Sequence, residues 1–409
     1  LRAPRAGRPP FVVRVGDTGD ALLALAAEHR RRHRARVVGV TGSCGKTSTK
    51  EWLGAVLAAA MPSVRSPGSY NNRVGVPLTL FQLTPETRAA VVEIGTSGPG
   101  EIAELTAAAR PDLGIVTCIA PAHLEGLGSL EGVAREKAAL PQALPADGLC
   151  ILNGDDAACR AMAELTPAAV ELVSVSREAD WFATDVRFHA LGTTFRLQGE
   201  RPVTLPRLGT HNVYNALFVI AAASRLGVPE ELVLRVLAAV PSAARRLEPK
   251  TAGGVTIFDD TYNMNPESAR SALQAMAGLG AGADRRAGRS VAVFGAMLEL
   301  GADSAALHRE LGRRVAEIGQ DRLVCVGRDA EPIADGAIAA GMPRSAVHCV
   351  DDVGAAHGLL RGMLQPGDRV LCKASRRYAL DRLVDRLVAE LGGDAAAAAD
   401  GAEGGGLGG

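Results

Sequence analysis

The chain has no excess of charge of either sign, because its 45 Lys and Arg residues are matched by 45 Asp and Glu residues. A neutral chain has no overall field that would draw it to nucleic acid or to an anionic membrane, so its partners must be recognised at local sites. It also lacks an apolar run of about 18 residues that could span a membrane. No stretch has the pattern of a secretory signal peptide. We therefore expect a cytoplasmic protein with no membrane span and no nucleic-acid partner.

The cysteines form no recognisable motif, because they are odd in number, scattered, and never spaced as Cys-x-x-Cys. This pattern argues against a disulfide framework and against a zinc site. We expect buried, reduced thiols. The seven positions are Cys44, Cys118, Cys150, Cys159, Cys325, Cys349 and Cys372.

Apolar runs of β type alternate with segments of helical periodicity along nearly the whole chain, which predicts an α/β fold with mainly parallel sheets. In the first half we expect strands at 36–41, 90–95, 113–119, 148–153 and 170–175. Shorter alternating runs within 181–205 are typical of an antiparallel edge. Helices are expected at 211–226 and 229–240, and 241–249 has the composition of a linker.

The second half repeats the strand and helix alternation, with strands expected at 255–258, 290–294, 322–326, 346–350 and 369–373 and a last helix at 378–391. This order is Rossmann-like. No GxGxxG motif follows a strand, so dinucleotide binding is not supported. The tail 392–409 is almost entirely Gly and Ala with a few acids, and we expect it to be disordered.

One glycine-rich segment, TGSCGKTSTKEW (41–52), follows an apolar run and precedes a helical stretch. Val40 replaces the first Gly of the pattern GxxxxGK[ST], so the match is to a shorter phosphate-binding loop. The glycines let backbone N–H groups turn inward, Lys46 can reach the terminal phosphates, and Thr47 can bind Mg²⁺. We therefore predict a nucleotide site, although the loop alone does not choose between kinase, GTPase and ligase. The loop residues expected to bind nucleotide are Gly42, Ser43, Cys44, Gly45, Lys46, Thr47 and Ser48.

Further segments decide between these classes. They are TGSCGKTSTKE (41–51), NNRVGVPLTL (71–80), VVEIG with GPGEI (91–102), AHLEGLGSLEGVAREKAAL (122–140), GTHNVYNAL (209–217), RRLE (245–248), DDTYNMNPES (259–268), FGAMLELG (294–301) and LCKASR (371–376). In this order, over 12–391, the chain resembles the Mur ligase family. NNRVGVPLTL and DDTYNMNPES favour the member that joins D-alanyl-D-alanine to UDP-N-acetylmuramoyl-tripeptide.

The resemblance implies an ATP-dependent, ADP-forming amide ligase of peptidoglycan precursor synthesis that works through an acyl phosphate, with two Mg²⁺ ions, as a monomer. It implies a remnant of an N-terminal UDP-binding domain with its linker (1–35), a central P-loop ATPase domain (36–247), a Rossmann-like C-terminal domain (248–391) and a disordered tail (392–409). The first residue, Leu1, is not Met, which indicates a cut chain, and such a chain would bind its UDP-linked substrate poorly. There are two alternatives. One is another amide ligase of this family, either the one that adds the third residue of the peptide or a folylpolyglutamate synthetase. The other is an inactive nucleotide-binding protein.

Three residues are candidates to hold metal ions together with Thr47. Glu93 ends an apolar strand, so its carboxylate should emerge at the edge of the sheet beside the phosphate loop, where it could bind Mg²⁺. His123 also follows a strand, but a lone His there is equally a satisfied loop residue. The resemblance implies that His123 is a ligand to a second metal ion.

Lys137 shares the apolar stripe of its helix with Leu130 and Val133, while Arg135 points to the other side. An inward lysine should have a lowered pKa and a nucleophilic amine. The resemblance implies that this amine takes up CO₂ and becomes a carbamate ligand to Mg²⁺; a surface lysine is the alternative.

The remaining candidates follow from matches to the family. Asn212 and Asn215 would contact the nucleotide, whereas His211 could be only a helix cap. Arg246 would reach the γ-phosphate from the domain joint, or would form an interdomain salt bridge. The cleft between the domains should be lined by Asp259, Asp260, Tyr262, Asn263 and Asn265. One of the two aspartates contacts the ribose or orients the incoming amine.

The dipeptide carboxylate would be held by Lys373, Ser375 and Arg376. The loop that contains Asn71 and Asn72 would either contact substrate or be structural. Cys44 and Cys118 stand where the family usually has Asn, and Ala374 where it usually has Gly.

Overall fold

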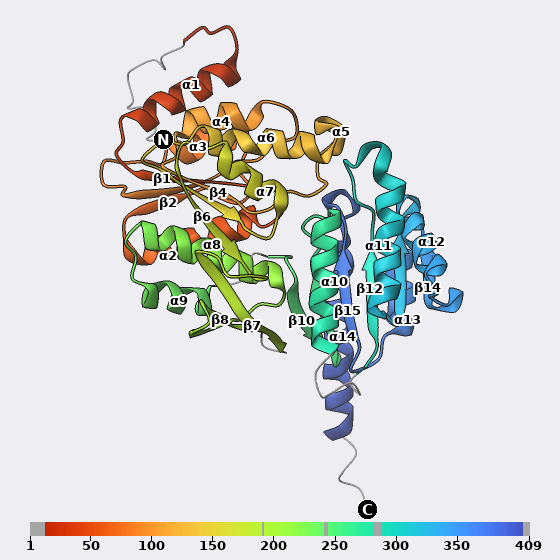
Figure 1. The fold of residues 1–409 in the computed structure, drawn as a ribbon. Helices are drawn as coiled ribbons and strands as arrows, with labels where there is room; N and C mark the ends of the chain where they lie inside the picture. The colour runs from red at the N-terminus through yellow and green to blue at the C-terminus, as the bar shows by residue number, and fades with distance from the viewer. Residues whose placement is uncertain (1–12, 190–191, 241–243, 281–287, 404–409) are drawn as a thin grey trace, which may run out of the picture.

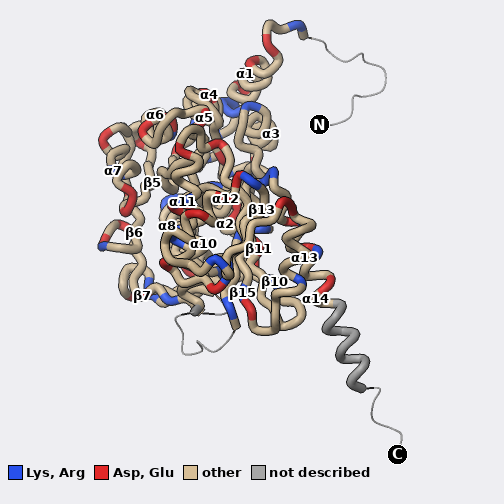
Figure 2. The backbone as a smooth tube through the Cα atoms, turned by 90° about the vertical axis from the view of Figure 1, so that its right-hand side faces the viewer, with Lys and Arg blue, Asp and Glu red and all other residues tan. Residues whose placement is uncertain are grey.

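The computed structural model describes residues 13–189, 192–240, 244–280 and 288–403. Its two α/β halves lie side by side, with the first half coloured red to green and the second coloured teal to blue (Figure 1). Basic and acidic residues are interspersed along the tube in Figure 2, as expected from their equal numbers. In the described ranges, we find no helix that combines the length and the apolar character needed to cross a membrane.

The first half is built on a sheet of order β2-β3-β1-β4-β5-β6-β7-β8-β9. Its parallel strands are β1 (Arg36–Thr41), β2 (Ser63–Arg65), β3 (Ala89–Glu93), β4 (Leu113–Val116), β5 (Leu149–Asn153) and β6 (Ala169–Ser174). The expected antiparallel edge is confirmed, because β8 (Gly192–Leu197) pairs antiparallel with both β7 (Trp181–His189) and β9 (Arg201–Leu205).

Helices cover both faces of this sheet because its strands are apolar on both sides. One face packs against α2 (Lys46–Ala60), α8 (Thr210–Arg225) and α9 (Glu230–Ala239). The other face packs against α1 (Thr18–Arg31), α3 (Gly75–Leu80), α4 (Glu101–Ala109), α6 (Leu130–Gln142) and α7 (Ala157–Ala161). A short helix, α5 (Leu124–Leu127), precedes α6.

The second half has a sheet of order β10-β11-β15-β12-β13-β14, as expected for a Rossmann-like arrangement. Its strands are β10 (Glu248–Ala252), β11 (Val255–Asp259), β12 (Ser290–Phe294), β13 (Arg322–Val326), β14 (Val347–Val350) and β15 (Arg369–Lys373). The helices α10 (Pro266–Gly280), α11 (Ser304–Ile318) and α12 (Glu331–Ala339) cover one face, and α13 (Val353–Met363) and α14 (Leu380–Glu403) cover the other.

Several expected boundaries differ from the structure. Strand β4 ends at Val116, not at 119, because the next residues turn away and bond to the phosphate loop. The predicted linker 241–249 contains the start of β10, a polar edge strand that pairs antiparallel with β11, while 241–243 lie outside the described residues. The predicted disordered tail, 392–409, stays a prediction; in the structure α14 extends to Glu403 through a segment rich in Ala, the strongest helix former. Residues 404–409 lie outside the described ranges.

All seven cysteines are free, as expected, but three of them are not buried. Cys349 is exposed because it lies on the edge strand β14. Cys44 and Cys118 are partly exposed because they lie at the phosphate loop.

Helix α6 supports the start of α4 through one buried carboxylate. The side chain of Glu136 accepts hydrogen bonds from the amides of Gly100 and Ile102, both at 2.7 Å. These are amides at a helix N-terminus, which have no partner within their own helix. A carboxylate placed there also complements the positive end of the helix dipole.

We expect Glu136→Ala to lower the free energy of unfolding by roughly 1.5–3 kcal/mol, because it removes two charge-assisted bonds from buried amides. Urea unfolding of the purified chain measures this. The matched control is Arg135→Ala on the exposed face of the same helix, which should change stability by less than about 0.5 kcal/mol. Equal losses in the two variants would contradict the capping role.

Candidate active site

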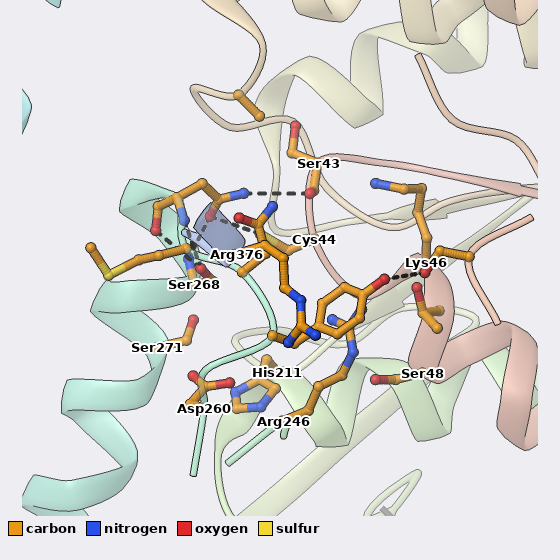
Figure 3. Close-up of a pocket in the computed structure, with 18 of the residues that line it drawn as sticks. Ser43, Cys44, Lys46, Ser48, His211, Arg246, Asp260, Ser268, Ser271 and Arg376 are labelled. Carbon is orange, nitrogen blue, oxygen red and sulfur yellow. Dashed lines mark hydrogen bonds between the residues drawn. The ribbon is translucent and has the colours of Figure 1, made fainter. Parts of the chain in front are cut away.

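A pocket of about 810 Å³ lies between the two halves, and the phosphate loop forms one of its walls. Figure 3 shows Arg246, Asp260 and Arg376, which come from the second half and the segment leading to it, gathered in the same pocket as Lys46 and Ser48. The predicted residues that line it are Ser43, Cys44, Gly45, Lys46, Thr47, Ser48, Asn71, Glu93, His123, His211, Asn212, Asn215, Arg246, Asp260, Tyr262, Asn263, Asn265, Lys373, Ser375 and Arg376. Four predicted residues lie outside the lining: Gly42, Asn72, Lys137 and Asp259.

The phosphate loop has a shape that requires glycine. Gly42 has φ 143°, and a Cβ added to it would lie 1.9 Å from the hydroxyl oxygen of Thr117. The amide of Ser43 donates to the carbonyl of Cys118 at 2.8 Å, so the segment after β4 supports the loop from behind. Helix α2 begins at Lys46, and no side chain of the described chain caps it. Its first amides are therefore available to an anion.

Lys46 folds back onto this loop, where its Nζ donates to the carbonyl of Gly42 at 2.6 Å. The ammonium therefore already sits over the loop whose amides would receive a phosphate.

Glu93 lies at the loop, as the strand-end argument predicted. One oxygen, Oε1, accepts from Thr47 Oγ1 at 3.2 Å and from Asn71 Nδ2 at 2.9 Å. The other, Oε2, is buried and has no hydrogen-bond partner within the described ranges, although the Nζ of the buried Lys50 lies 3.8 Å away. A buried carboxylate oxygen beside a threonine hydroxyl is the oxygen-donor chemistry that Mg²⁺ prefers.

His123 opens α5 and contacts Glu299 of the second half through Nδ1. Burial lowers the pKa of His123, so its imidazole is neutral at pH 7 and has the form that binds metals. In the described part of the chain, however, no cluster of three or more His, Cys, Asp or Glu side chains could hold a metal ion by itself. A cation at this edge would need further ligands, such as phosphate oxygens.

Lys137 points inward, as its helical stripe predicted, with 1% of its surface exposed, while Arg135 faces solvent. Burial, followed by the nearby charge of Lys46, lowers the pKa of Lys137 to about 7. Its Nζ forms no hydrogen bond or ion pair with any residue the structure describes. Lys137 therefore lies behind the wall of the pocket as a buried amine that is substantially neutral at pH 7.

The N-terminal part of α8 packs against the phosphate loop and the start of α2. The Oδ1 of Asn215 accepts from Thr49 at 3.2 Å and would lie 2.7 Å from a Cβ added to Gly45. Asn212 bonds to the carbonyl of Leu208 at 2.8 Å, within its own helix start. His211 does not cap the helix; its Nδ1 has no described partner, and burial lowers its pKa to about 4.

The second half contributes a buried ion pair. Lys373, at the end of β15, lies 2.6 Å from Asp260, which follows β11. Burial raises the pKa of Asp260 despite the opposing charge of Lys373. Asp259 points away, because successive strand residues face opposite sides, and it pairs with Lys250 at 2.7 Å. Of the two aspartates, only Asp260 reaches the pocket.

Arg246 does not form the interdomain salt bridge that the sequence left open. Its guanidinium carbon lies 4.3 Å from the ring centroid of Tyr262, in a cation–π contact between two residues that line the pocket. The Oγ of Ser375 accepts from the amide of Leu298 at 2.9 Å, so Ser375 is occupied within the protein. Asn72 is structural, because its Oδ1 accepts from the amide of Gly75 at the start of α3.

Direct bonds join the phosphate loop to the second half. The thiol of Cys44 donates to Asn265 Oδ1 at 3.1 Å, and Asn265 Nδ2 donates to the carbonyl of Ser43 at 3.4 Å. The hydroxyls of Ser69 and Tyr262 also bond to each other. The pocket is therefore closed around the loop by contacts between the halves.

Sequence reasoning missed one buried cationic residue of the pocket, Arg207. Arg207, 8% exposed, lies over the ring of Trp52 at 5.1 Å, and burial lowers its pKa to about 10. Arg207 Nε and Nη2 and Trp52 Nε1 are buried without a hydrogen-bond partner among the residues described. Trp52 could have been found from its spacing, one helical turn after Ser48 on α2. No motif marks Arg207, which follows the antiparallel edge.

Comparison with known proteins agrees with this geometry. Residues 40–223 match the Mur ligase middle domain, and residues 245–376 match the Mur ligase, glutamate ligase domain. The UDP-N-acetylmuramoyl-tripeptide–D-alanyl-D-alanine ligase of Mycobacterium tuberculosis is 40% identical over 400 residues, covering 91% of this chain and 78% of the relative. The enzyme of the same name from Escherichia coli is 36% identical over 339 residues, covering 80% and 72%.

Solved structures give the same result. MurF from Acinetobacter baumannii superposes with a TM-score of 0.84 at 30% identity, covering 93% of this chain and 83% of that one. MurF ligase from Thermotoga maritima in complex with ADP gives 0.82 at 26% identity, covering 96% and 87%. The fold, the phosphate loop and these similarities together show that the chain belongs to the Mur ligase family.

Proposed function

We propose that the chain joins D-alanyl-D-alanine to the terminal carboxylate of UDP-N-acetylmuramoyl-tripeptide, with conversion of ATP to ADP, as a cytoplasmic monomer in peptidoglycan precursor synthesis. The observation that carries this proposal is one pocket in which an uncapped phosphate loop faces Arg246, Asp260 and Lys373. The relatives named for this reaction support it, and the Thermotoga maritima relative was solved with ADP. Residues 36–247 would form the ATP-binding domain and residues 248–391 the C-terminal domain.

The chain's own residues would position the triphosphate. The loop amides and Lys46 bind the terminal phosphates, as in other phosphate loops. Arg246, which is in cation–π contact with Tyr262, donates to the phosphoryl group as it passes to the tripeptide carboxylate, where negative charge develops. The product of this step is an acyl phosphate, and ADP leaves.

The residues at the loop fit a bound Mg²⁺, because Glu93 Oε2 is buried without a hydrogen-bond partner in the described chain, with the Lys50 ammonium 3.8 Å away, and Thr47 bonds to the other carboxylate oxygen. When bound, the cation neutralises charge on the phosphoryl oxygens. We assign a second ion to His123 and to a carbamate on Lys137. Lys137 fits that modification, because its buried amine is neutral enough to react with CO₂ and its ammonium form is repelled by Lys46.

The amide bond would then form at the second half. The amine of D-alanyl-D-alanine attacks the acyl carbon, and inorganic phosphate leaves. Asp260, rather than Asp259, contacts the ribose or orients this amine, because only Asp260 reaches the pocket. Lys373 is held in a buried pair with Asp260, so we assign the dipeptide carboxylate to Arg376, which lines the pocket, has a largely exposed side chain and pairs with Asp381 at 3.2 Å in the folded chain. Contacts between the halves exclude water that would hydrolyse the acyl phosphate.

The direct test is ADP release by the purified chain with ATP, Mg²⁺ and UDP-N-acetylmuramoyl-tripeptide. We expect D-alanyl-D-alanine to stimulate release, whereas glutamate, lysine and diaminopimelate do not. Lys46→Met should lower the rate by about 100-fold or more, because it removes a charge that stabilises the transition state. The surface variant Arg135→Met serves as its control. Stimulation by another amine, or by none, would reject the proposal.

Lys137 allows a test that does not depend on turnover. The amine becomes more neutral as pH rises through about 7, so uptake of ¹³C-bicarbonate as a carbamate should increase from pH 6 to 8. Carbon NMR measures this, and Lys137→Met should show no carbamate signal. Equal signals in the two proteins would contradict the assignment.

Lys137→Met should also unfold at a higher temperature at neutral pH. The pKa of Lys137 is lower in the folded chain than the ordinary value of 10.5, so the unfolded chain binds more protons between about pH 7 and 10.5. The native amine therefore costs stability, fully so below pH 7, and the cost disappears as pH rises towards 10.5.

Arg207 should bind the nucleotide, because it lines the pocket and two of its buried nitrogens have no hydrogen-bond partner among the described residues. We expect Arg207→Leu to raise the KM for ATP roughly tenfold, because one charge-assisted hydrogen bond to the nucleotide is lost. The melting temperature should stay unchanged or rise. Steady-state kinetics and thermal unfolding measure the two effects. Arg201→Leu, an exposed arginine on β9, is the control. Lost stability with an unchanged KM would show that Arg207 is only structural.

A further inference from the structure

Two thiols lie against each other at the phosphate loop, and the ligase reaction uses neither. The Sγ of Cys118 is 3.3 Å from the amide nitrogen of Cys44 and 3.7 Å from its carbonyl oxygen. Both cysteines are free and partly exposed, and Cys44 lines the pocket. We propose that Cys44 and Cys118 are a redox modification site, in which a peroxide oxidises Cys44, Cys118 closes a disulfide with it, and nucleotide binding is weakened.

The backbone already holds these two cysteines together. The amide of Ser43 donates to the carbonyl of Cys118 at 2.8 Å, and the hydroxyl of Thr117 donates to the carbonyl of Cys44. These bonds hold the two segments side by side, and a disulfide between them requires Cα atoms about 4.4–6.8 Å apart. To form the disulfide, the Cys44 thiol must give up its hydrogen bond to Asn265.

The two thiols are unequal in a way that suits this chemistry. The hydrogen bond with Cys118 is the largest cause that lowers the pKa of Cys44 to about 7, and Lys46 adds to it. The same contact, with burial, raises the pKa of Cys118 well above its ordinary value. Cys44 is therefore the thiol that reacts first, and Cys118 is the one that resolves the product.

The reaction balances with a peroxide as the oxidant. The thiolate of Cys44 attacks one oxygen of hydrogen peroxide, an S–O bond forms, the O–O bond breaks, and hydroxide leaves. The sulfur of Cys118 then attacks the Cys44 sulfenic acid, an S–S bond forms, the S–O bond breaks, and the departing hydroxide takes the Cys118 proton as water. In total, two thiols are oxidised by two electrons, and one peroxide is reduced to two waters.

A disulfide between Cys44 and Cys118 would remove a hydrogen-bond donor of the phosphate loop from phosphate binding. In the reduced chain the amide of Cys44 donates to the thiol of Cys118, which can rotate away and release that donor to a phosphate. A disulfide holds the sulfur against the amide. It also removes the Cys44 bond to Asn265, one of the links between the loop and the second half. Losing one such donor corresponds to a nucleotide affinity lower by roughly 10- to 100-fold.

The chain contains a matched comparator pair. Cys325 and Cys349 face each other in register on β13 and β14, and neither lines the pocket. Contact with Cys325 lowers the pKa of Cys349 to about 7, and Cys349 is exposed. A peroxide should reach this pair too, but its oxidation should leave nucleotide affinity unchanged.

The test uses the full chain carrying Cys349→Ser, with the unsubstituted chain in parallel. Each is treated with hydrogen peroxide, quenched with catalase, and divided between peptide mapping by mass spectrometry and ADP titration by calorimetry. We expect a Cys44–Cys118 cross-linked peptide in both proteins, an ADP dissociation constant raised 10- to 100-fold, and recovery with dithiothreitol. A second substitution, Cys118→Ser in the Cys349→Ser chain, should abolish the cross-link. If that double variant folds poorly, the peptide map of the unsubstituted chain still shows whether the disulfide forms.

Two results would overturn the inference. One is a map in which Cys44 and Cys118 stay reduced while Cys325 and Cys349 are oxidised. The other is a complete Cys44–Cys118 disulfide with unchanged ADP affinity. The effect on affinity rests on the proposed nucleotide site, whereas the cross-link does not. A reduced chain that fails to bind ADP would refute the proposed function and the inhibitory effect, while the peptides alone still decide whether the disulfide forms.

Discussion

The close packing of Gly42 against Thr117 is the contact on which the rest of the site depends. Without a Cβ, Gly42 allows the end of β1 to turn directly over the segment that leaves β4. That turn starts α2 at Lys46, so the unpaired amides of a helix and a lysine ammonium face the same pocket. Because β1 lies between β3 and β4 in the sheet, the same edge also presents Glu93 and the segment leading to His123.

Several buried polar atoms of residues that line the pocket have no hydrogen-bond partner among the described residues. They are Trp52 Nε1, His211 Nδ1 and two nitrogens of Arg207, and also Glu93 Oε2, although the Lys50 ammonium lies 3.8 Å from that oxygen. Each such group costs about 1–3 kcal/mol when left unsatisfied, a large amount for a domain of marginal stability. One cavity is therefore lined by hydrogen-bond donors that can bind a phosphate ester and by a carboxylate oxygen that can bind a cation. These unpaired groups lower the stability of the folded chain, and a bound ligand would recover that free energy by pairing with them.

Much of this arrangement could be predicted from the sequence, because the relevant signals are local. The run 36–41 followed by the glycine loop predicted β1 and a nucleotide site, and the helical stripe of α6 predicted that Lys137 points inward. Predictions were wrong or incomplete where the answer depends on distant partners. Strand β10 is polar and recognisable only from its pairing with β11. The choice between Asp259 and Asp260 depends on which face of that strand meets Lys250 and which meets Lys373. Arg207 lies in no motif, so only the fold brings it over Trp52.

The contacts between the halves explain how one pocket can serve two substrates. Asn265 bonds to the phosphate loop through both its oxygen and its nitrogen, while Tyr262 bonds to Ser69 and also supports Arg246. These links use neutral side chains, so exchanging them for bonds to a ligand costs little, since one hydrogen bond replaces another. The charged pair of Asp260 and Lys373 lies entirely within the second half, so it makes no link to the phosphate loop. The links between the halves can therefore be exchanged for bonds to a ligand, while Asp260 and Lys373 stay in place at the ends of β11 and β15.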